Sequence, residues 1–187
     1  MEPHDYLKRL PAETYRGQAY VHWSMTMENR KTGWLVPIFY YKFREILTHT
    51  AFRYGLCCPI YCCMPDHLHL LWVGILDGCD QRLAVRYFRK QLNPILEKLG
   101  ARFQKQPYDH VLTEEQRERQ AFENAAAYIA RNPERAGLVK PDGYRDYPYT
   151  GCLVPGYPEL KLWNEDFWER FWHIYLHLQQ HGLAADS

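Results

Sequence analysis

Four stretches of the chain have patterns of apolar residues that predict β-strands. Successive side chains of a strand point to opposite faces, so a two-residue period with many β-branched and aromatic residues predicts a strand. Residues 18–27 alternate in this way, and we also predict strands at residues 56–64 and 67–75 and, with a bend at Pro107, within residues 101–112. Pro65 and Asp66 separate the second stretch from the third and predict a turn between them.

Between these stretches the apolar residues recur at helical spacing. Pro37 and Gly55 are favourable residues to begin and to end a helix, and Thr113 with Gln116 matches a capping box. We predict helices over residues 37–54, 80–99, 114–131, 133–136 and 164–180, the last capped by Asn164. We expect an irregular loop at residues 144–160 and a polar, loosely held arm at residues 1–17.

The predicted order of elements is β-α-β-β-α-β-α-α. Strands mixed with two crossover helices are typical of an α+β protein in which an antiparallel sheet carries helices on one face. We therefore predict a ferredoxin-like fold with an additional C-terminal helix, which is rich in aromatic residues.

The composition fits a globular domain and narrows the choice of partners. The chain has 187 residues, of which 47% are hydrophobic, and a formal net charge of +1. This charge does not indicate a general affinity for nucleic acid, so any basic surface has to be local. The sequence shows no apolar run of about 18 residues and no signal-like leader, and we expect a cytoplasmic protein that does not contact membranes.

The six cysteines raise the question of a metal cluster, because four of them crowd one predicted strand: Cys57, Cys58, Cys62 and Cys63. Adjacent strand residues face opposite sides, so each Cys-Cys pair is divided between the two faces of the sheet. A structural zinc site also needs a second pair of ligands far along the chain. We therefore expect four small, buried, reduced apolar side chains.

His67 and His69 are the strongest candidates for chemistry. Residues two apart in a strand share a face, so the two imidazoles are expected side by side, where they can hold a divalent cation. Such a pair is also common as two ordinary, hydrogen-bonded strand histidines, and the pair alone does not decide between the two interpretations.

A second group of candidates lies on the predicted helix at residues 114–131. Tyr128 and Asn132 are four residues apart and so face the same way, and the alanines around Tyr128 leave room for a ligand. Each has an ordinary alternative. Tyr128 can be one of many packed tyrosines, and Asn132 can be the N-cap of a short helix that continues with Pro133.

Three segments together resemble a known family. They are Met64 to Leu71 (MPDHLHLL), Tyr108 to Leu112 (YDHVL) and Tyr128 to Val139 (YIARNPERAGLV). Their order and spacing are similar to those of motifs in the single-tyrosine HUH transposases, and especially in the REP-associated tyrosine transposases. The resemblance implies a transposase-like domain over residues 1–150 and a C-terminal loop and helix extension over residues 151–187.

The resemblance also implies an activity. Tyr128 would be the nucleophile, and His67, His69 and Asn132 would bind Mg²⁺ or Mn²⁺. Attack on hairpin-forming single-stranded DNA, such as a palindromic repeat, would produce a 5′-phosphotyrosine link and a free 3′-hydroxyl, so that strands can be rejoined without ATP. The chain would act as a monomer or a homodimer. Candidate DNA contacts are Arg82, Arg86, Arg89, Lys90, Lys105, Arg131 and Arg135.

Several of these residues have alternatives. A basic strip is by default a solvated helix face, and we favour a turn histidine for His110 over a group that supports the site. Tyr108, Tyr147 and Tyr149 either stack on unpaired bases or pack against the protein. Two other functions also stay open: a hairpin-DNA-binding protein without efficient chemistry, and an unrelated metal-dependent phosphoester hydrolase in which water attacks.

Overall fold

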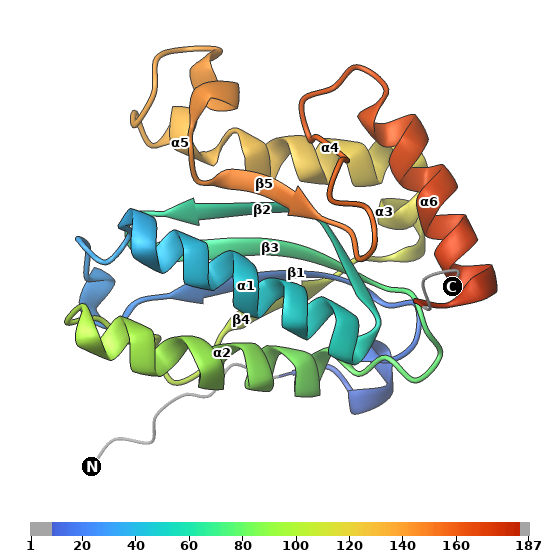
Figure 1. Cartoon of the computed structure of the whole chain (residues 1–187), viewed down its shortest axis with the longest axis horizontal. Helices are drawn as coiled ribbons and strands as arrows, with labels where there is room; N and C mark the ends of the chain where they lie inside the picture. Colours follow the sequence, from blue (N-terminus) through green and yellow to red (C-terminus); the bar gives the residue numbers. More distant parts are fainter. Residues whose placement is uncertain (1–8, 184–187) are drawn as a thin grey trace.

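The computed structural model describes residues 9–183, and a five-stranded antiparallel sheet lies at its centre (Figure 1). The strands are β1 (Tyr20–Thr26), β2 (Leu56–Met64), β3 (His67–Gly74), β4 (Tyr108–Val111) and β5 (Thr150–Leu153). The α-helices are α1 (Pro37–Tyr54), α2 (Gln81–Lys98), α3 (Glu114–Arg117), α4 (Arg119–Ala130), α5 (Asn132–Arg135) and α6 (Phe167–His181). Short 3₁₀ turns are η1 (Ala12–Tyr15), η2 (Glu28–Arg30) and η3 (Gly143–Asp146).

The strand order β4-β1-β3-β2-β5 contains two split β-α-β units. Strands β1 and β2 both run antiparallel to β3, so they are parallel to each other and flank it. In the same way, β3 and β4 are parallel and flank β1. Two interleaved units of this kind form the ferredoxin-like arrangement, so the predicted α+β fold class is confirmed. Strand β5 extends the sheet beyond β2.

Helices cover both faces of the sheet (Figure 1). Helices α1 and α2 bury one core cluster, which includes Trp72 and Phe88. Helices α4 and α6 bury a second cluster on the opposite face, which includes Leu71 and Phe122. The expectation of helices on one face therefore holds for the two crossover helices, whereas the chain after β4 returns over the other face.

Strand β2 is buried along its whole length because its two faces lie under different helix layers. Its cysteines alternate as predicted, with Cys58 and Cys63 in the cluster under α1 and α2, and Cys57 and Cys62 in the cluster under α4 and α6. All are free thiols. Burial raises the pKa of Cys62 to about 12, so this thiol stays protonated and apolar near neutral pH.

Local signals place some helix ends correctly and miss others. Helix α1 has the predicted bounds and ends at Gly55, whose φ of 65° suits the left-handed region. The predicted capping box of Thr113 and Gln116 is present, but it begins only the four-residue helix α3. Glu118 is extended and α4 starts again after it, so the predicted helix at residues 114–131 is wrong as one element. Asn164 also does not cap α6, which has Asp166 at its N-cap.

The expected N-terminal arm is more tightly held than predicted. Residues 1–8 lie outside the described part of the chain, but Tyr15 is fully buried in η1. Its hydroxyl donates a hydrogen bond to the carboxylate of Asp109 on β4, and Arg9 donates to the Pro107 carbonyl at 2.9 Å. These contacts attach the segment before β1 to the edge of the sheet, which short-range sequence patterns do not indicate.

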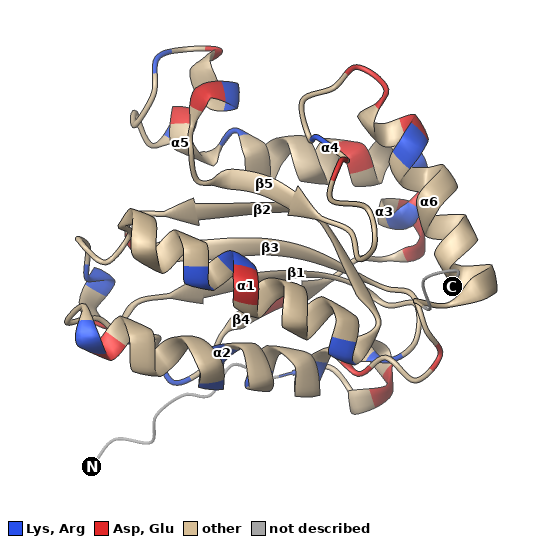
Figure 2. Cartoon of the chain, in the orientation of Figure 1, with Lys and Arg blue, Asp and Glu red and all other residues tan. Residues whose placement is uncertain are grey.

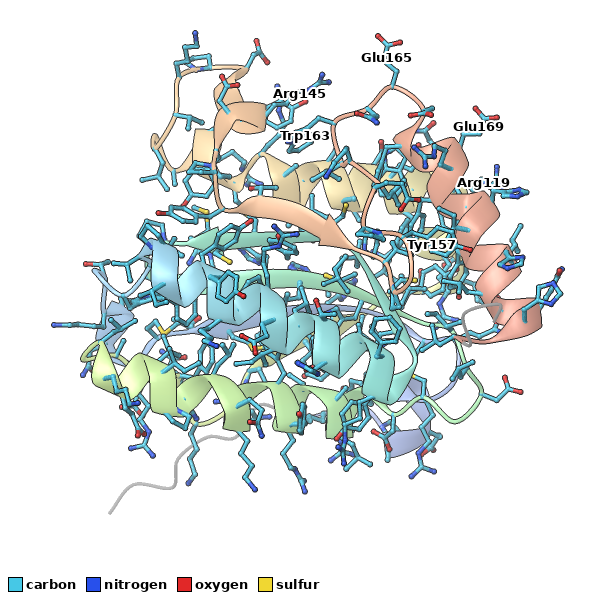
Figure 3. The ribbon with its side chains drawn as sticks, viewed as in Figure 1. Arg119, Arg145, Tyr157, Trp163, Glu165 and Glu169 are labelled. Carbon is cyan, nitrogen blue, oxygen red and sulfur yellow. The ribbon has the colours of Figure 1, made fainter. Side chains whose placement is uncertain are left out.

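The expected loop at residues 144–160 contains η3 and β5, so it too is more regular than predicted. Thr150 pairs with Cys62 of β2, and the chain then continues through a loop that carries Tyr157 and Trp163 (Figure 3). The division at residue 150 falls at the start of β5 and stays a prediction. No helix within residues 9–183 has both the length and the apolarity that a membrane crossing requires.

Phe122 of α4 is a test of the core between the sheet and α6. It has no exposed surface, and its ring lies 5.3 Å from that of Tyr20 and 5.2 Å from that of Trp172. Phe122→Ala is expected to lower the free energy of unfolding by about 3–5 kcal/mol, because it leaves a cavity that the sheet cannot close. Urea denaturation measures the change. Phe52→Ala, at a site that is 46% exposed, is the matched control and should cost less than about 1 kcal/mol; equal losses would contradict the assignment.

Candidate active site

The two candidate histidines stand at the beginning of β3. Their spacing puts His67 and His69 on the face that α4 covers, while Leu68 between them belongs to the cluster under α1 and α2. The Nε2 atoms of His67 and His69 lie 2.9 Å apart. The structure therefore brings the two imidazoles together, as the two-residue period predicts. Their role as metal ligands stays a prediction.

Each of these imidazoles has a second partner on its other nitrogen. His67 Nδ1 lies 2.6 Å from Asp66 Oδ1, and His69 Nδ1 lies 3.0 Å from His22 Nε2. His22 comes from β1, the strand next to β3 in the sheet. Asp66, His67, His69 and His22 therefore form one continuous hydrogen-bonded chain, which we call the histidine chain.

The sequence analysis did not identify His22. Strand β1 alternates between Val21 and Trp23, which are fully buried under α2, and His22 and Ser24, which face the α4 side. A histidine on the polar face of a strand was the available signal. It could not be used without knowing that β1 pairs with β3, since strand pairing is not visible in the local pattern.

Burial keeps two members of the histidine chain, His22 and His69, neutral. Burial, with a contribution from His110, lowers the pKa of His22 to about 4. Burial, with contributions from His22 and His67, lowers the pKa of His69 to about 3. Burial opposes ionisation of Asp66, but hydrogen bonds from His67 and Arg30 outweigh it and lower the pKa of that carboxyl. Asp66 is therefore an ionised acceptor.

Hydrogen-bond directions follow for the state in which all three imidazoles are neutral. A neutral imidazole carries a single N–H. In that state Asp66 accepts from Nδ1 of His67, so Nε2 of His67 accepts, and His69 donates to it through Nε2. Nδ1 of His69 then accepts from Nε2 of His22. In this protonation state, Asp66 and His22 hold the rings of the two candidate ligands from either side.

Tyr128 lies on the last turn of α4 and faces the same side of the sheet. It is 53% exposed, so the alternative of a packed core tyrosine does not apply. Tyr128 lines a cavity of about 190 Å³ together with His22 and His110. The guanidinium of Arg135 on α5 lies 4.1 Å from the centre of the Tyr128 ring, within the range of a cation–π contact.

Asn132 does not act as an N-cap. It is the first residue of α5, and its side-chain amide donates to the Ile129 carbonyl at 3.1 Å, at the end of α4. The capping alternative is therefore wrong, and the ligand role stays a prediction. Within residues 9–183, no group of three or more His, Cys, Asp or Glu side chains is arranged to hold a metal ion. A cation at His67 and His69 would need oxygen ligands besides.

The remaining aromatic and histidine candidates are divided by the structure into packed and exposed residues. His110 is not in a turn; it lies on β4 opposite His22, and its Nε2 is 3.0 Å from Gln116 Oε1. Tyr147 is buried and donates to the Cys63 carbonyl at 2.8 Å, and Tyr149 packs edge-on against Tyr40. Only Tyr108 among the three tyrosines considered for base stacking is exposed, at 54%.

The predicted DNA contacts divide into two groups. Five of them lie in one cavity of about 830 Å³ between α2 and the segment before β4, which we call the α2 groove: Arg82, Arg86, Arg89, Lys90 and Lys105. Figure 2 shows Lys and Arg on the lower side of α2. Arg9 and Arg102 also line the groove, and the sequence analysis missed both.

The second group lies beside the candidate nucleophile. Arg131 is ion-paired with Glu134 at 3.1 Å and with Asp142 at 2.6 Å, which offsets its charge. Arg135 is the residue that stacks on Tyr128. The contacts of both groups with DNA stay predictions.

The candidate site consists of a histidine pair on one face of an antiparallel ferredoxin-like sheet and an exposed tyrosine on the helix over that face. No protein-family model matches the chain, and a search of curated proteins finds no match. Among solved structures, the chain is similar to a REP-associated tyrosine transposase bound to a REP hairpin, with a TM-score of 0.63 and 18% sequence identity. The alignment covers 78% of this chain and 81% of that one. At this identity the likeness shows a shared fold.

The lowered pKa values of His22 and His69 predict how stability depends on pH in chelator-treated protein. The folded-state pKa values of His22 and His69 lie below the ordinary value, so the unfolded chain binds more protons between pH 4 and 6.5. Stability should therefore fall as the pH drops from 7 to 5, by about 2 kcal/mol for each residue. Urea denaturation at both pH values measures the loss. His22→Gln should remove about half of it; an unchanged loss in this variant would contradict the assignment.

Proposed function

We propose that the protein is a DNA strand transferase of the REP-associated tyrosine transposase type, which acts on hairpin-forming single-stranded DNA in DNA transposition. The observation that carries the proposal is the position of Tyr128, exposed and on a cavity shared with His22 of the histidine chain. The fold shared with a transposase bound to a REP hairpin supports the class of substrate.

The donor atoms of the site fit a divalent cation. His67 and His69 would hold Mg²⁺ or Mn²⁺ through their Nε2 atoms, while Asp66 and His22 orient the rings. Two imidazoles leave the remaining positions to oxygen ligands, such as Asn132, water or a DNA phosphate. When bound, the ion would polarise the scissile phosphate and stabilise the charge that develops on it.

Loading a cation would change the proton positions in the histidine chain. Both Nε2 atoms need a free lone pair, so His69 has to carry its proton on Nδ1 instead. His69 then donates to Nε2 of His22, and His22 carries its own proton on Nδ1. The hydrogen bond between the two residues is kept with its direction reversed, so neither imidazole has to become charged.

The chemistry proposed for Tyr128 is a transesterification. Its oxygen forms a bond to phosphorus while the bond from phosphorus to the 3′-oxygen breaks, and the departing oxygen takes up a proton to become a 3′-hydroxyl. The phenolic proton is lost in the same exchange. One phosphodiester is replaced by another, so a new 3′-hydroxyl can reverse the step and join strands.

The direct test is a covalent-adduct assay. Labelled hairpin DNA with a single-stranded extension is incubated with the protein and Mn²⁺ or Mg²⁺ and then run on a denaturing gel. We expect a metal-dependent protein–DNA band that disappears in Tyr128→Phe, because the nucleophilic oxygen is absent, and that falls at least about 100-fold in His67→Ala. Tyr41→Phe, at another exposed tyrosine on α1, is the matched control and should keep the band.

The same assay separates the two competing functions. Binding of the hairpin without any band would indicate a DNA-binding protein that lacks efficient chemistry. Metal-dependent cleavage without a band, which persists in Tyr128→Phe, would indicate hydrolysis by water and would falsify the nucleophile assignment.

Arg135 is expected to position Tyr128. Its planar guanidinium stacks on the ring and restricts the rotamers of the tyrosine. Arg135→Lys keeps the charge but loses the planar contact, so adduct formation should slow about tenfold while hairpin affinity stays within about twofold. Single-turnover rates and fluorescence anisotropy measure the two quantities. A parallel loss of affinity and rate would instead make Arg135 a phosphate contact.

A further inference from the structure

A further cavity, of about 540 Å³, opens beside the edge strand β5, between α1 and the loop at residues 154–163. Figure 1 shows β5 next to β2, with α1 below them. None of the described residues that line this cavity also lines the cavity of Tyr128 or the α2 groove, so the sites described above do not account for it. We call it the β5 pocket. Its volume is typical of sites that bind small molecules.

Two tyrosine hydroxyls form the polar part of the β5 pocket. Tyr61 of β2 lies against Gly151 of β5, where a Cβ would be only 2.5 Å from the tyrosine hydroxyl, so glycine leaves the room that Tyr61 needs. The hydroxyls of Tyr61 and Tyr40 lie 3.0 Å apart, and within residues 9–183 neither has another hydrogen-bond partner. One bond between two hydroxyls uses only one of their two hydrogens. The other hydrogen can therefore be donated to an oxygen of a ligand.

The rest of the pocket wall is mainly apolar and includes further aromatic rings. Phe52 of α1 is 46% exposed although it is apolar, and Tyr157 and Trp163 on the loop are partly exposed (Figure 3). Aliphatic side chains complete the wall: Leu153, Val154, Leu160 and Leu162. Covering such a surface removes apolar area from water, and aromatic rings attract one another beyond the area that they bury. The wall therefore suits a ligand with an aromatic ring.

The charge of the β5 pocket is positive. Arg44 and Lys161 line it, and within residues 9–183 neither forms an ion pair. Burial raises the pKa of Cys152, which also lines the pocket, to about 11, while Arg44 and Lys161 act in the opposite direction. Arg44 opposes the effect of burial on the pKa values of Tyr40 and Tyr61 in the same way. No Asp or Glu is among the described residues of the wall, so an anion is attracted.

We propose that the β5 pocket binds a small organic anion that consists of an aromatic ring and an acidic group. The ring packs against Phe52 and the loop, and the acidic group pairs with Arg44 and Lys161 and accepts the remaining hydroxyl hydrogen of the two tyrosines. The inference goes beyond the proposed function, because it does not depend on DNA or on Tyr128. A free small molecule is favoured over an unpaired DNA strand, since the pocket shares no lining residue with the cavity of Tyr128 or with the α2 groove.

The experiment compares two fluorescent probes that differ in charge. 8-Anilinonaphthalene-1-sulfonate carries an anionic sulfonate, and N-phenyl-1-naphthylamine has the same rings without it. Each probe is titrated into the full-length protein without DNA or divalent ions, and the fluorescence gives its affinity. The pocket variant is Arg44→Gln with Lys161→Gln, both exposed. The matched control, Arg86→Gln with Lys90→Gln, removes the same charge from exposed residues of the α2 groove.

We expect the pocket variant to bind the sulfonate probe about tenfold more weakly or worse, because two charged contacts are lost, and the neutral probe within about twofold of the original affinity. The control variant should bind both probes within about twofold. Phe52→Ala should weaken both probes alike, by about threefold or more, because both lose the same ring contact. 1-Naphthoate should displace the sulfonate probe at least about tenfold better than octanoate, whose carboxylate carries a flexible aliphatic chain.

Other outcomes overturn the inference. Absence of binding, or equal effects of the pocket variant on both probes, would exclude an anion site at Arg44 and Lys161. An equal loss of the sulfonate probe in the control variant would mean general attraction of anions. Equal displacement by octanoate would indicate a site for aliphatic acids, and displacement by oligothymidine would assign the pocket to an unpaired DNA strand. Since no cleavage is measured, a failed adduct assay leaves these results interpretable, and absence of probe binding leaves the assignment of Tyr128 intact.

Discussion

Two-residue alternation along β1 and β3, with a helix layer on each side of the sheet, is the constraint on which the rest of the structure depends. Trp23 and Leu68 point into the cluster under α1 and α2, and their neighbours His22 and His67 point to the α4 side. A shift of one residue in the pairing of β1 with β3 would place imidazoles in the apolar core and indoles at the site. The packing of the core therefore holds the histidine chain in register.

The same constraint explains why the histidines are neutral. His22 and His69 lie on the face of the sheet that α4 partly covers, and their burial disfavours the charged form of each imidazole. A neutral imidazole costs less to bury than a charged one, but its burial is still costly unless its nitrogens are hydrogen-bonded, and the chain from Asp66 to His22 supplies these bonds. Desolvation and hydrogen bonding together keep His22 and His69 uncharged, and a change of tautomer at His69 is enough to free its Nε2 lone pair.

Short-range patterns were sufficient for elements whose signals are local. The bounds of α1 and β2, the capping box at Thr113 and the alternation of the cysteines all follow from neighbouring residues. The pairing of β5 with β2 and the docking of Arg9 against Asp109, 100 positions away, depend on the tertiary structure instead. The site divides in the same way. The adjacency of His67 and His69 is local, whereas the contribution of His22 requires the neighbouring strand.

The net charge of +1 is a poor guide to the electrostatics of this protein. Charges act over about 8–10 Å at physiological salt, so a partner senses the local arrangement and not the sum over the chain. Elsewhere on the surface, acidic residues offset the charge of basic neighbours, as Glu45 does for Lys42 and Glu134 for Arg131. The α2 groove, in contrast, is lined by seven cationic residues and one acidic residue. Charge that is nearly balanced in the sequence is therefore separated in the fold. The α2 groove on one face of the sheet is cationic, and the imidazoles of His22 and His69 on the other face are neutral. A local excess of cations of this kind attracts anions to one part of the surface although the whole protein is nearly neutral.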